Sequence, residues 1–185
     1  TKDKERLLYA PERSENPVTS ITVKKDEEVT YMDFVNHMKL ESVLVEDGHA
    51  RYSSKDGILY DVTGDTLIYC PRQHKNPAIA EGTKVIGSHA FYNNNHFSTI
   101  EIPNSVTTIG NYAFEACYGL KNITIPESVH TMRDAFSLCD SLTTIVYNAK
   151  SPSGERFDGI SSPFGYSPSS VTSFTIGNTV EVIPA

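Results

Sequence analysis

The chain has 185 residues, of which 38% are hydrophobic, and its 16 basic and 23 acidic residues give a formal net charge of −7. This apolar content suffices for one domain or one run of stacked repeats, and it argues against a disordered chain. The charges form no basic stripe and no run of about 18 apolar residues occurs, so we expect neither nucleic-acid binding nor direct membrane insertion in this fragment.

Residues 1–50 are predicted to form a degenerate N-terminal unit. Phe34 precedes Val43 by the same nine residues that separate phenylalanine from a strand isoleucine in the later copies, so we assign FVNHMKLESVLV to the repeat series. The stretch LLYAP at 7–11 resembles a later strand, which indicates that the chain begins partway through an equivalent unit. TKDKERLLYAPE lacks the apolar segment of a secretory signal, so we expect any signal or anchor to be absent from this fragment.

Residues 52–71 predict a β-hairpin insertion. Residues 58–62 and 66–69 are rich in β-branched and aromatic side chains, and Thr63-Gly64-Asp65 joins them. Asp56-Gly57 is compatible with a calcium loop, but the surrounding sequence lacks the ligand spacing of an EF-hand. A hairpin is therefore the preferred interpretation.

Residues 79–147 contain regular repeats. A shift of 23 residues, from Ile86 to Ile109, aligns ten identical positions, namely Ile86, Gly87, Ala90, Phe91, Ile100, Ile102, Pro103, Ser105, Val106 and Thr108 with their counterparts. A third copy, AFSLCDSLTTIVY, follows at a shift of 22. Self-similarity of this period predicts a solenoid, in which each turn buries its apolar side only by stacking on its neighbours.

Each repeat predicts one short strand that pairs in parallel with the next turn, about 4.8 Å away. The alternation in Ile100-Glu101-Ile102 points the two isoleucines inward and the glutamate outward. Pro103 ends the strand because it cannot donate to the ladder, and Gly87 and Gly110 suit a tight corner. The repeated phenylalanines are predicted to form a buried column of Phe91, Phe114 and Phe136.

The cysteines are predicted to be buried free thiols. Cys70, Cys117 and Cys139 have no metal-ligand spacing, and an odd number cannot form a closed disulfide framework. Asn94 takes the cysteine position of the first regular repeat. Two further departures, Arg133 for the corner glycine and Asn148 for the strand-ending proline, leave the geometry of the third turn open.

Residues 148–185 predict a loop-expanded repeat. The stretch NAKSPSGERFDGISSPFGYSPSS is rich in serine, glycine and proline, as in long surface loops, and Phe164 is a candidate for the phenylalanine column. SVTSFTIGNTVEVIP then restarts the strand pattern, with Gly177 in the place of Pro126.

The segments LKNITIPESV and IGNYAFEAC together resemble the BspA-like leucine-rich repeats of the treponemal type, most clearly over residues 79–147. This resemblance implies a single leucine-rich-repeat fragment over residues 1–185. The fold class is a right-handed β-rich solenoid with short parallel strands, tight turns and few short helical turns, plus the hairpin insertion. It also implies a secreted or surface-anchored bacterial protein, of a kind that includes adhesins for host matrix proteins or other bacteria.

Two surfaces are candidates for binding. The first is the row of outward strand positions, with Glu101, Lys121, Asn122 and Thr124, which can hydrogen-bond a protein or a glycan. The second carries tyrosines, whose rings offer apolar area and a hydroxyl to a protein or a sugar. These are Tyr92, Tyr112 and Tyr118. The competing interpretation is a solvated face in the first case and packing under a neighbouring turn in the second.

The sequence offers no constellation for catalysis, and we expect no metal and no cofactor. It has no phosphate-binding glycine loop, no GxSxG elbow and no HExxH motif, and its histidines lie at loop-like or exposed positions without a paired carboxylate. The histidines are His37, His49, His74, His89, His96 and His130. We therefore expect a non-enzymatic module for protein recognition or adhesion, with a host matrix or bacterial surface protein as partner. A carbohydrate-binding module and a structural spacer that displays another domain are the alternatives.

Overall fold

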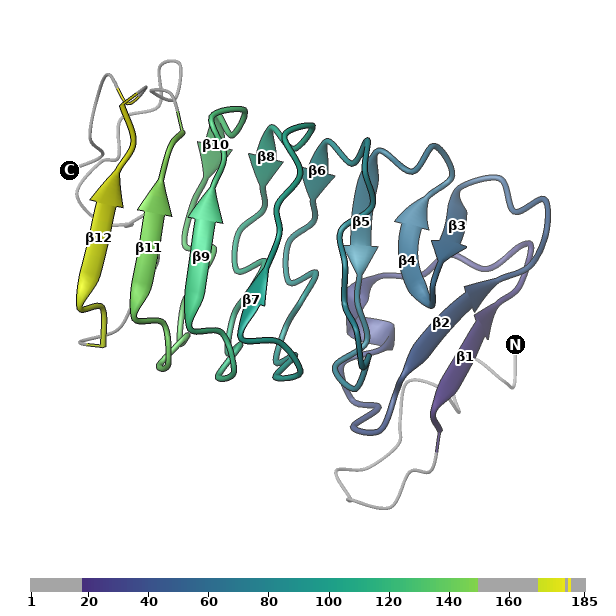
Figure 1. Cartoon of the computed structure of the whole chain (residues 1–185). Coiled ribbons are helices and arrows are strands. Elements are labelled where there is room, and N and C mark those ends of the chain that lie inside the picture. Colours follow the sequence, from purple (N-terminus) through teal and green to yellow (C-terminus); the bar gives the residue numbers. More distant parts are fainter. Residues whose placement is uncertain (1–17, 150–169, 179, 181–185) are drawn as a thin grey trace.

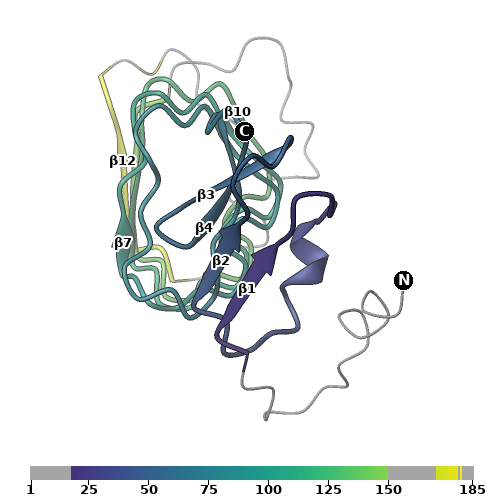
Figure 2. The same cartoon turned by 90° about the vertical axis from the view of Figure 1, so that its right-hand side faces the viewer.

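The computed structural model describes residues 18–149, 170–178 and 180. Successive turns of backbone lie side by side and form a β-solenoid (Figure 1). Viewed along its length, the turns follow nearly the same path, with the N-terminal unit beside them (Figure 2). Within the described ranges the only helix is the short 3-10 turn η1 (Tyr31–Asp33), and no helix there has the length and apolar character that crossing a membrane requires.

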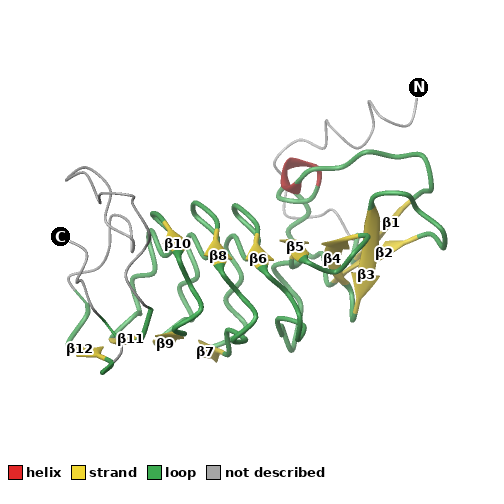
Figure 3. Cartoon of the chain, turned by 90° about the horizontal axis from the view of Figure 1, so that it is seen from above, coloured by secondary structure: helices red, strands yellow, loops and turns green. Residues whose placement is uncertain are grey.

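Two sheets run along the solenoid on opposite sides (Figure 3). The first has the order β12-β11-β9-β7, with β7 (Thr99–Ile100), β9 (Asn122–Ile125), β11 (Thr144–Tyr147) and β12 (Ser173–Ile176) all parallel. The second has the order β10-β8-β6-β5-β4-β3, with β3 (Tyr52–Lys55), β4 (Ile58–Asp61), β5 (Thr66–Tyr69), β6 (Val85–Ile86), β8 (Thr108–Ile109) and β10 (Thr131–Met132). Each regular repeat therefore contributes one strand to each sheet, and the strand of the second sheet is one that the sequence analysis did not assign.

The register of the first sheet stacks equivalent residues on one another. Ile100 pairs with Ile123, Ile123 with Ile145, and Ile145 with Phe174. Ile123 and Ile145 are buried, whereas Thr124 is exposed on the outer face. The predicted alternation of inward and outward side chains is confirmed, and it sets which residues can meet a partner.

The phenylalanine column is confirmed. Phe91, Phe114 and Phe136 are fully buried, and their rings stack nearly parallel with centroids 4.9 and 5.0 Å apart. Burial contributes about 1.5–3 kcal/mol for each phenylalanine and stacking about 0.5–1.5 kcal/mol for each pair. The column thus joins the three turns into one core.

The corner glycines are required by close stacking of the backbone and not by an unusual backbone angle. A Cβ on Gly110 would lie 2.6 Å from the amide nitrogen of Ser88, and a Cβ on Gly87 would lie 2.8 Å from the carbonyl oxygen of Leu67. Arg133 takes the equivalent place in the third turn, yet β10 and β11 keep the parallel register of the earlier turns. The strands of the third turn therefore keep the regular register, although the corner at Arg133 is one residue shorter than the corner at Gly110.

The hairpin strands form as predicted, and they also start the solenoid. β4 pairs antiparallel with β3 and β5, while β5 pairs in parallel with β6. The second strand of the hairpin is thus the first rung of the parallel ladder.

The N-terminal unit forms a second core beside the repeats. Its strands β1 (Ser20–Val23) and β2 (Ser42–Val45) make a separate parallel pair. Phe34 is buried, but its ring stacks on Tyr69 at 5.1 Å between centroids, in a cluster distinct from the phenylalanine column. Phe34 thus has the nine-residue spacing of the repeats but lies outside the phenylalanine column. The predicted position of Phe164 lies outside the described residues.

The three cysteines are free and buried, as predicted. The Cys117 thiol donates to the carbonyl oxygen of Phe91, and the Cys139 thiol donates to that of Phe114, each at 3.1 Å. One turn earlier, Asn94 takes the place of the cysteine, and its Nδ2 donates to the carbonyl oxygen of Pro71 at 2.8 Å. Burial raises the pKa of the Cys117 thiol well above its ordinary value, so it stays protonated and keeps its hydrogen.

Candidate functional site

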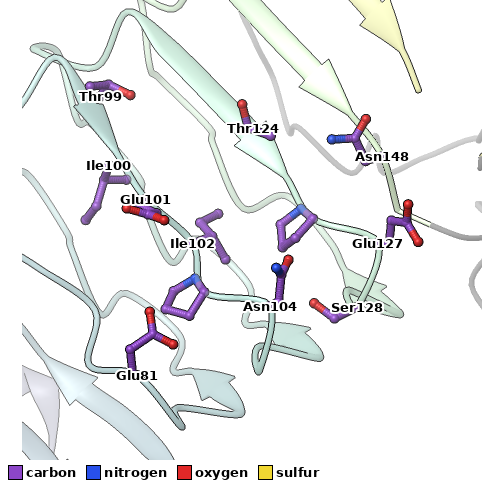
Figure 4. Close-up of a pocket in the computed structure, with 12 residues that line it drawn as sticks. Glu81, Thr99, Ile100, Glu101, Ile102, Asn104, Thr124, Glu127, Ser128 and Asn148 are labelled. Carbon is purple, nitrogen blue, oxygen red and sulfur yellow. The ribbon is translucent and has the colours of Figure 1, made fainter. Parts of the chain in front are cut away.

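A groove of about 950 Å³ lies at the corner of the solenoid where β7, β9 and β11 end. Pro103 and Pro126 form buried parts of its wall. We call it the acidic groove, and its polar lining includes Glu81, Glu101, Asn104, Thr124, Glu127 and Ser128 (Figure 4). It is an open depression across several turns, so it can receive an extended ligand.

The lining of the acidic groove is itself a product of the repeat. Glu81, Asn104 and Glu127 follow one another at intervals of 23 residues and occupy the same place in three successive turns. Because turns stack about 4.8 Å apart, the two glutamates lie roughly 10 Å from each other along the solenoid. Glu101, which is exposed and directly follows β7, adds a third carboxylate.

Among the described residues, all the charged side chains that line the acidic groove are glutamates. Glu81, Glu101 and Glu127 are exposed, and no lysine, arginine or histidine occurs among the described residues that line it. The hydroxyl oxygen of Ser128 is buried and has no hydrogen-bond partner among the described residues. The lining can therefore accept hydrogen bonds from cationic or neutral donors, while Ile100 and Ile102 supply apolar surface.

Only some of the predicted strand-face residues line the acidic groove. Glu101 and Thr124 line the acidic groove, whereas Lys121 and Asn122 are exposed but do not line it. Sequence reasoning missed Glu81, Asn104 and Glu127. They were missed because the comparison of repeats considered the strand positions and not the turn that follows. The 23-residue period would have identified the three residues as one column.

The predicted tyrosine surface is in part a packing cluster. Tyr92 and Tyr112 lie against His89, with ring centroids 6.2 and 5.4 Å away, and Tyr31 of η1 stacks on the same imidazole at 4.4 Å. Tyr31 was not predicted, because it comes from the N-terminal unit. Tyr118 is 46% exposed and has no ring contact with this cluster among the described residues.

His89 is the centre of this cluster, and the prediction that it has no carboxylate partner is wrong. Its Nε2 lies 3.5 Å from a carboxylate oxygen of Glu115, while its Nδ1 is buried with no partner among the described residues. Burial lowers the pKa of His89, and the Glu115 carboxylate opposes that shift. His37 and His49 also differ from expectation, since both are buried.

Arg72 fastens the N-terminal unit beside this cluster. It is 6% exposed, donates from Nη2 to the Val35 carbonyl oxygen at 2.9 Å, and contacts the Met38 sulfur through Nη1. Its guanidinium carbon lies 6.0 Å from the ring centroid of Tyr92. These contacts join the loop after η1 to the first regular repeat.

The described residues contain no group of three or more histidines, cysteines or acidic residues arranged to hold a metal ion. The carboxylates of the acidic groove are thus spread along a surface and do not converge on one point. The surface presents carboxylate, amide and hydroxyl groups along several turns.

Comparisons with known proteins agree with the fold. The family described as the BspA type leucine rich repeat region matches residues 66–185 in six copies. The crystal structure of the pneumococcal vaccine antigen PcpA has a TM-score of 0.65 and 23% identity, over 85% of this chain and 35% of that chain. A leucine-rich repeat protein from Eubacterium ventriosum has a TM-score of 0.62 and 22% identity, over 71% and 36% of the two chains.

A leucine-rich cell surface protein from Faecalibacterium prausnitzii has a TM-score of 0.55 and 23% identity, over 86% of this chain and 52% of that chain. The present chain thus corresponds to between about a third and a half of these solved structures. A comparison with curated proteins gives no match. Because the repeat pattern matches over residues 66–185, the chain belongs to the BspA-type leucine-rich repeat family.

Proposed function

We propose that this chain is a non-catalytic protein-recognition module of a secreted or cell-surface bacterial protein, and that the acidic groove is its contact surface. The observation that carries the proposal is the groove itself, an open depression of about 950 Å³ whose polar lining is repeated over successive turns. A stacked array holds such a lining rigidly, so little order has to be gained when a partner binds.

The partner that we propose is another protein, such as a host matrix protein or a bacterial surface protein. The groove residues Glu81, Glu101 and Asn104 are exposed and lie outside the packed columns, so they can contact a ligand without disturbing the core. The proposal for location is supported by the solved relatives, one of which is described as a vaccine antigen and another as a cell surface protein.

A carbohydrate-binding module is the second candidate, and the exposed tyrosines favour it. Tyr112 is 36% and Tyr118 46% exposed, and exposed tyrosine rings can stack on sugars. A structural spacer is the third candidate, in which neither surface binds a ligand.

The test is a binding screen of this chain against purified matrix proteins and a glycan array. We expect saturable binding to at least one protein, with little loss in Tyr112→Ala/Tyr118→Ala. Binding to glycans alone, abolished by the tyrosine substitutions, would establish the second candidate instead. Absence of binding in both screens would refute recognition by this fragment and support a spacer.

A further inference from the structure

We propose that residues 27–33, which we call the cover segment, form a pH-sensitive cover over His89 that neutral histidines hold in place and that acid releases. Two contacts carry this inference. The imidazole of His49 holds one end of the cover segment through hydrogen bonds that need a neutral ring, and Tyr31 at the other end stacks on His89. The inference concerns the chain without a ligand, so it does not depend on the proposed function.

His49 fastens the connection between β2 and β3 to the start of the cover segment. It is 6% exposed, and its Nδ1 accepts hydrogen bonds from the amides of Arg51 and Tyr52, each at 3.1 Å. Because Nδ1 is an acceptor, the hydrogen of the neutral ring lies on Nε2, which donates to the Glu27 carbonyl oxygen at 3.0 Å. A proton on Nδ1 would set an N–H group against two amide N–H groups in a buried place. Acid therefore breaks the contacts that fix this end.

Tyr52 extends the hold on the cover segment toward η1. Its ring lies against the His49 imidazole, with centroids 4.8 Å apart. Its hydroxyl donates to the Val29 carbonyl oxygen at 3.0 Å and accepts from the Val29 amide at 3.3 Å. Since η1 begins two residues after Val29, the position of Tyr31 depends on the hydrogen bonds around His49.

The charged groups around His49 are either paired or exposed to water. Solvent screens exposed charges, so they offset little of the hydrogen bonding that a protonated ring would lose. The paired groups are Glu28 with the Arg51 guanidinium at 3.2 Å, and the carboxylates of Glu27 and Glu46 with the backbone amides of Lys24 and Lys25, each at 2.9 Å. The side chains of Lys24, Lys25, Asp26 and Asp47 are exposed.

His89 favours release of the cover segment in the same direction. Tyr31 covers its ring at 4.4 Å between centroids, with the two planes 3° apart. Burial lowers the pKa of His89 from 6.5, and the Glu115 carboxylate 3.5 Å from Nε2 opposes that shift. Release exposes the imidazole to water, so the released form binds more protons than the covered form between the lowered pKa and 6.5. The titratable or charged groups on the elements packed there also include Asp33, Arg72, Tyr92 and Tyr112.

Arg72 confines the release to the cover segment. It donates to the Val35 carbonyl oxygen at 2.9 Å and contacts the Met38 sulfur, and these contacts involve no histidine. The loop after η1 is therefore expected to stay docked on the first regular repeat while the cover segment moves. The movement uncovers the ring face of His89 that Tyr31 now occupies, beside Tyr92.

The size of the effect follows from proton binding. A histidine that stays neutral in the held state and has its ordinary pKa of about 6.5 once released shifts the equilibrium toward release by about tenfold between pH 7.5 and pH 5.5. His49 alone thus supplies about this factor, and His89 adds to it. Local opening of this kind is measured by amide hydrogen exchange.

The test follows exchange residue by residue by NMR on the whole chain at pH 5.5, 6.5 and 7.5, corrected for the intrinsic exchange rate. The reporters are the amides of Val29, Arg51 and Tyr52, which donate to the groups that hold the cover segment. We expect their protection to fall tenfold or more between pH 7.5 and pH 5.5, while the amides of β9 and β11 change by less than twofold.

His49→Asn/His89→Asn removes both titrating groups, and the asparagine oxygen at position 49 can replace Nδ1 as the acceptor. We expect lower protection of the reporters than in wild type at pH 7.5, because the bond to Glu27 and the stacking on Tyr31 are lost, and a change of less than twofold on acidification. The matched control is His130→Asn, which removes an exposed histidine outside the cover segment and should keep the wild-type pH dependence.

Thermal unfolding at pH 7.5 establishes that the variants fold, and the wild-type comparison of the reporters with β9 and β11 decides the question even if the double variant does not. Equal loss of protection in the reporters and in these strands would overturn the proposal, because the opening would then be global. Unchanged protection of the reporters in wild type would overturn it too. So would a tenfold loss that persists in the double variant, since another group, such as the buried His37, would then govern the release.

Discussion

Asn94 shows that a single residue can replace the cysteine of the repeat. Its Nδ2 donates to the Pro71 carbonyl oxygen at 2.8 Å, and its Oδ1 accepts from the His96 amide at 3.1 Å. Asn94→Ala leaves these backbone groups without a side-chain partner, so we expect a loss of about 1–3 kcal/mol in the free energy of unfolding. Urea denaturation measures the loss. Asn122→Ala, on the exposed outer face of β9, is the matched control and should stay within about 0.5 kcal/mol of wild type.

Leu138 illustrates a constraint of the backbone that the sequence does not reveal. Three residues at the same place in successive turns have positive φ, namely Asn93 at 54°, Ala116 at 57° and Leu138 at 59°. Asparagine adopts this left-handed region more readily than leucine, while β-branched residues strongly disfavour it. We expect Leu138→Asn to retain wild-type stability and Leu138→Val to lower the free energy of unfolding by about 1–2 kcal/mol.

Chemical denaturation of the two Leu138 variants provides the check. Leu138 is 44% exposed, so the loss of its side-chain packing is small in both variants and does not explain a difference between them. Equal stability of the asparagine and valine variants would contradict the role assigned to the left-handed backbone.

At the level of elements, Arg72 holds the segment after η1 against the first regular repeat. Its guanidinium contacts Val35 and Met38 of the N-terminal unit, and it also lies over the Tyr92 ring of the first regular repeat. Arg72→Met keeps the approximate length but removes the donors, so we expect faster amide hydrogen exchange in residues 31–45 than in wild type, with little change in residues 99–132.

The control for this prediction is Arg51→Met, which removes an exposed ion pair of the same unit, 3.2 Å from Glu28. An exposed pair contributes about 0–1 kcal/mol, so exchange in residues 31–45 should stay near the wild-type rate. Equal acceleration in the two variants would show that Arg72 does not have a special role in docking the unit.

Across the whole molecule, the sequence predicted the features that the repeat period or a local strand and turn pattern controls. The period placed Phe91, Phe114 and Phe136 in one column because each turn must bury the same position against the next. Contacts between non-equivalent units follow no such rule. The stacking of Tyr31 on His89 joins residues 58 positions apart without a shared spacing, and no pattern could have predicted it.

The candidate site divides in the same way. Glu101 and Thr124 were found because strand alternation points them outward, whereas Glu81 and Glu127 occupy the turn position of the repeat, where no alternation operates. Their groove arises only when the turns are stacked. The period contains the information for it, but the depth of the depression depends on the packed shape of the corner.

The stability of the whole solenoid should fall in mildly acidic solution. Burial lowers the pKa of both His37 and His89 from the ordinary value of 6.5. Between the lowered pKa and 6.5 the unfolded chain binds more protons than the folded chain, so the free energy of unfolding rises with pH in that window. The stabilisation is complete above pH 6.5 and is lost as the pH falls through the folded pKa values.

Urea denaturation between pH 5 and pH 7.5 measures this dependence, and His89→Asn separates the contribution of the tyrosine cluster. Asparagine tolerates the positive φ of 57° at this position and does not titrate. We expect the variant to be less stable at pH 7.5, because the stacking on Tyr31 is lost, yet to lose less further stability on acidification than wild type. A steeper dependence in the variant would mean that the Glu115 carboxylate, 3.5 Å from Nε2, outweighs desolvation and favours the protonated imidazole in the folded protein.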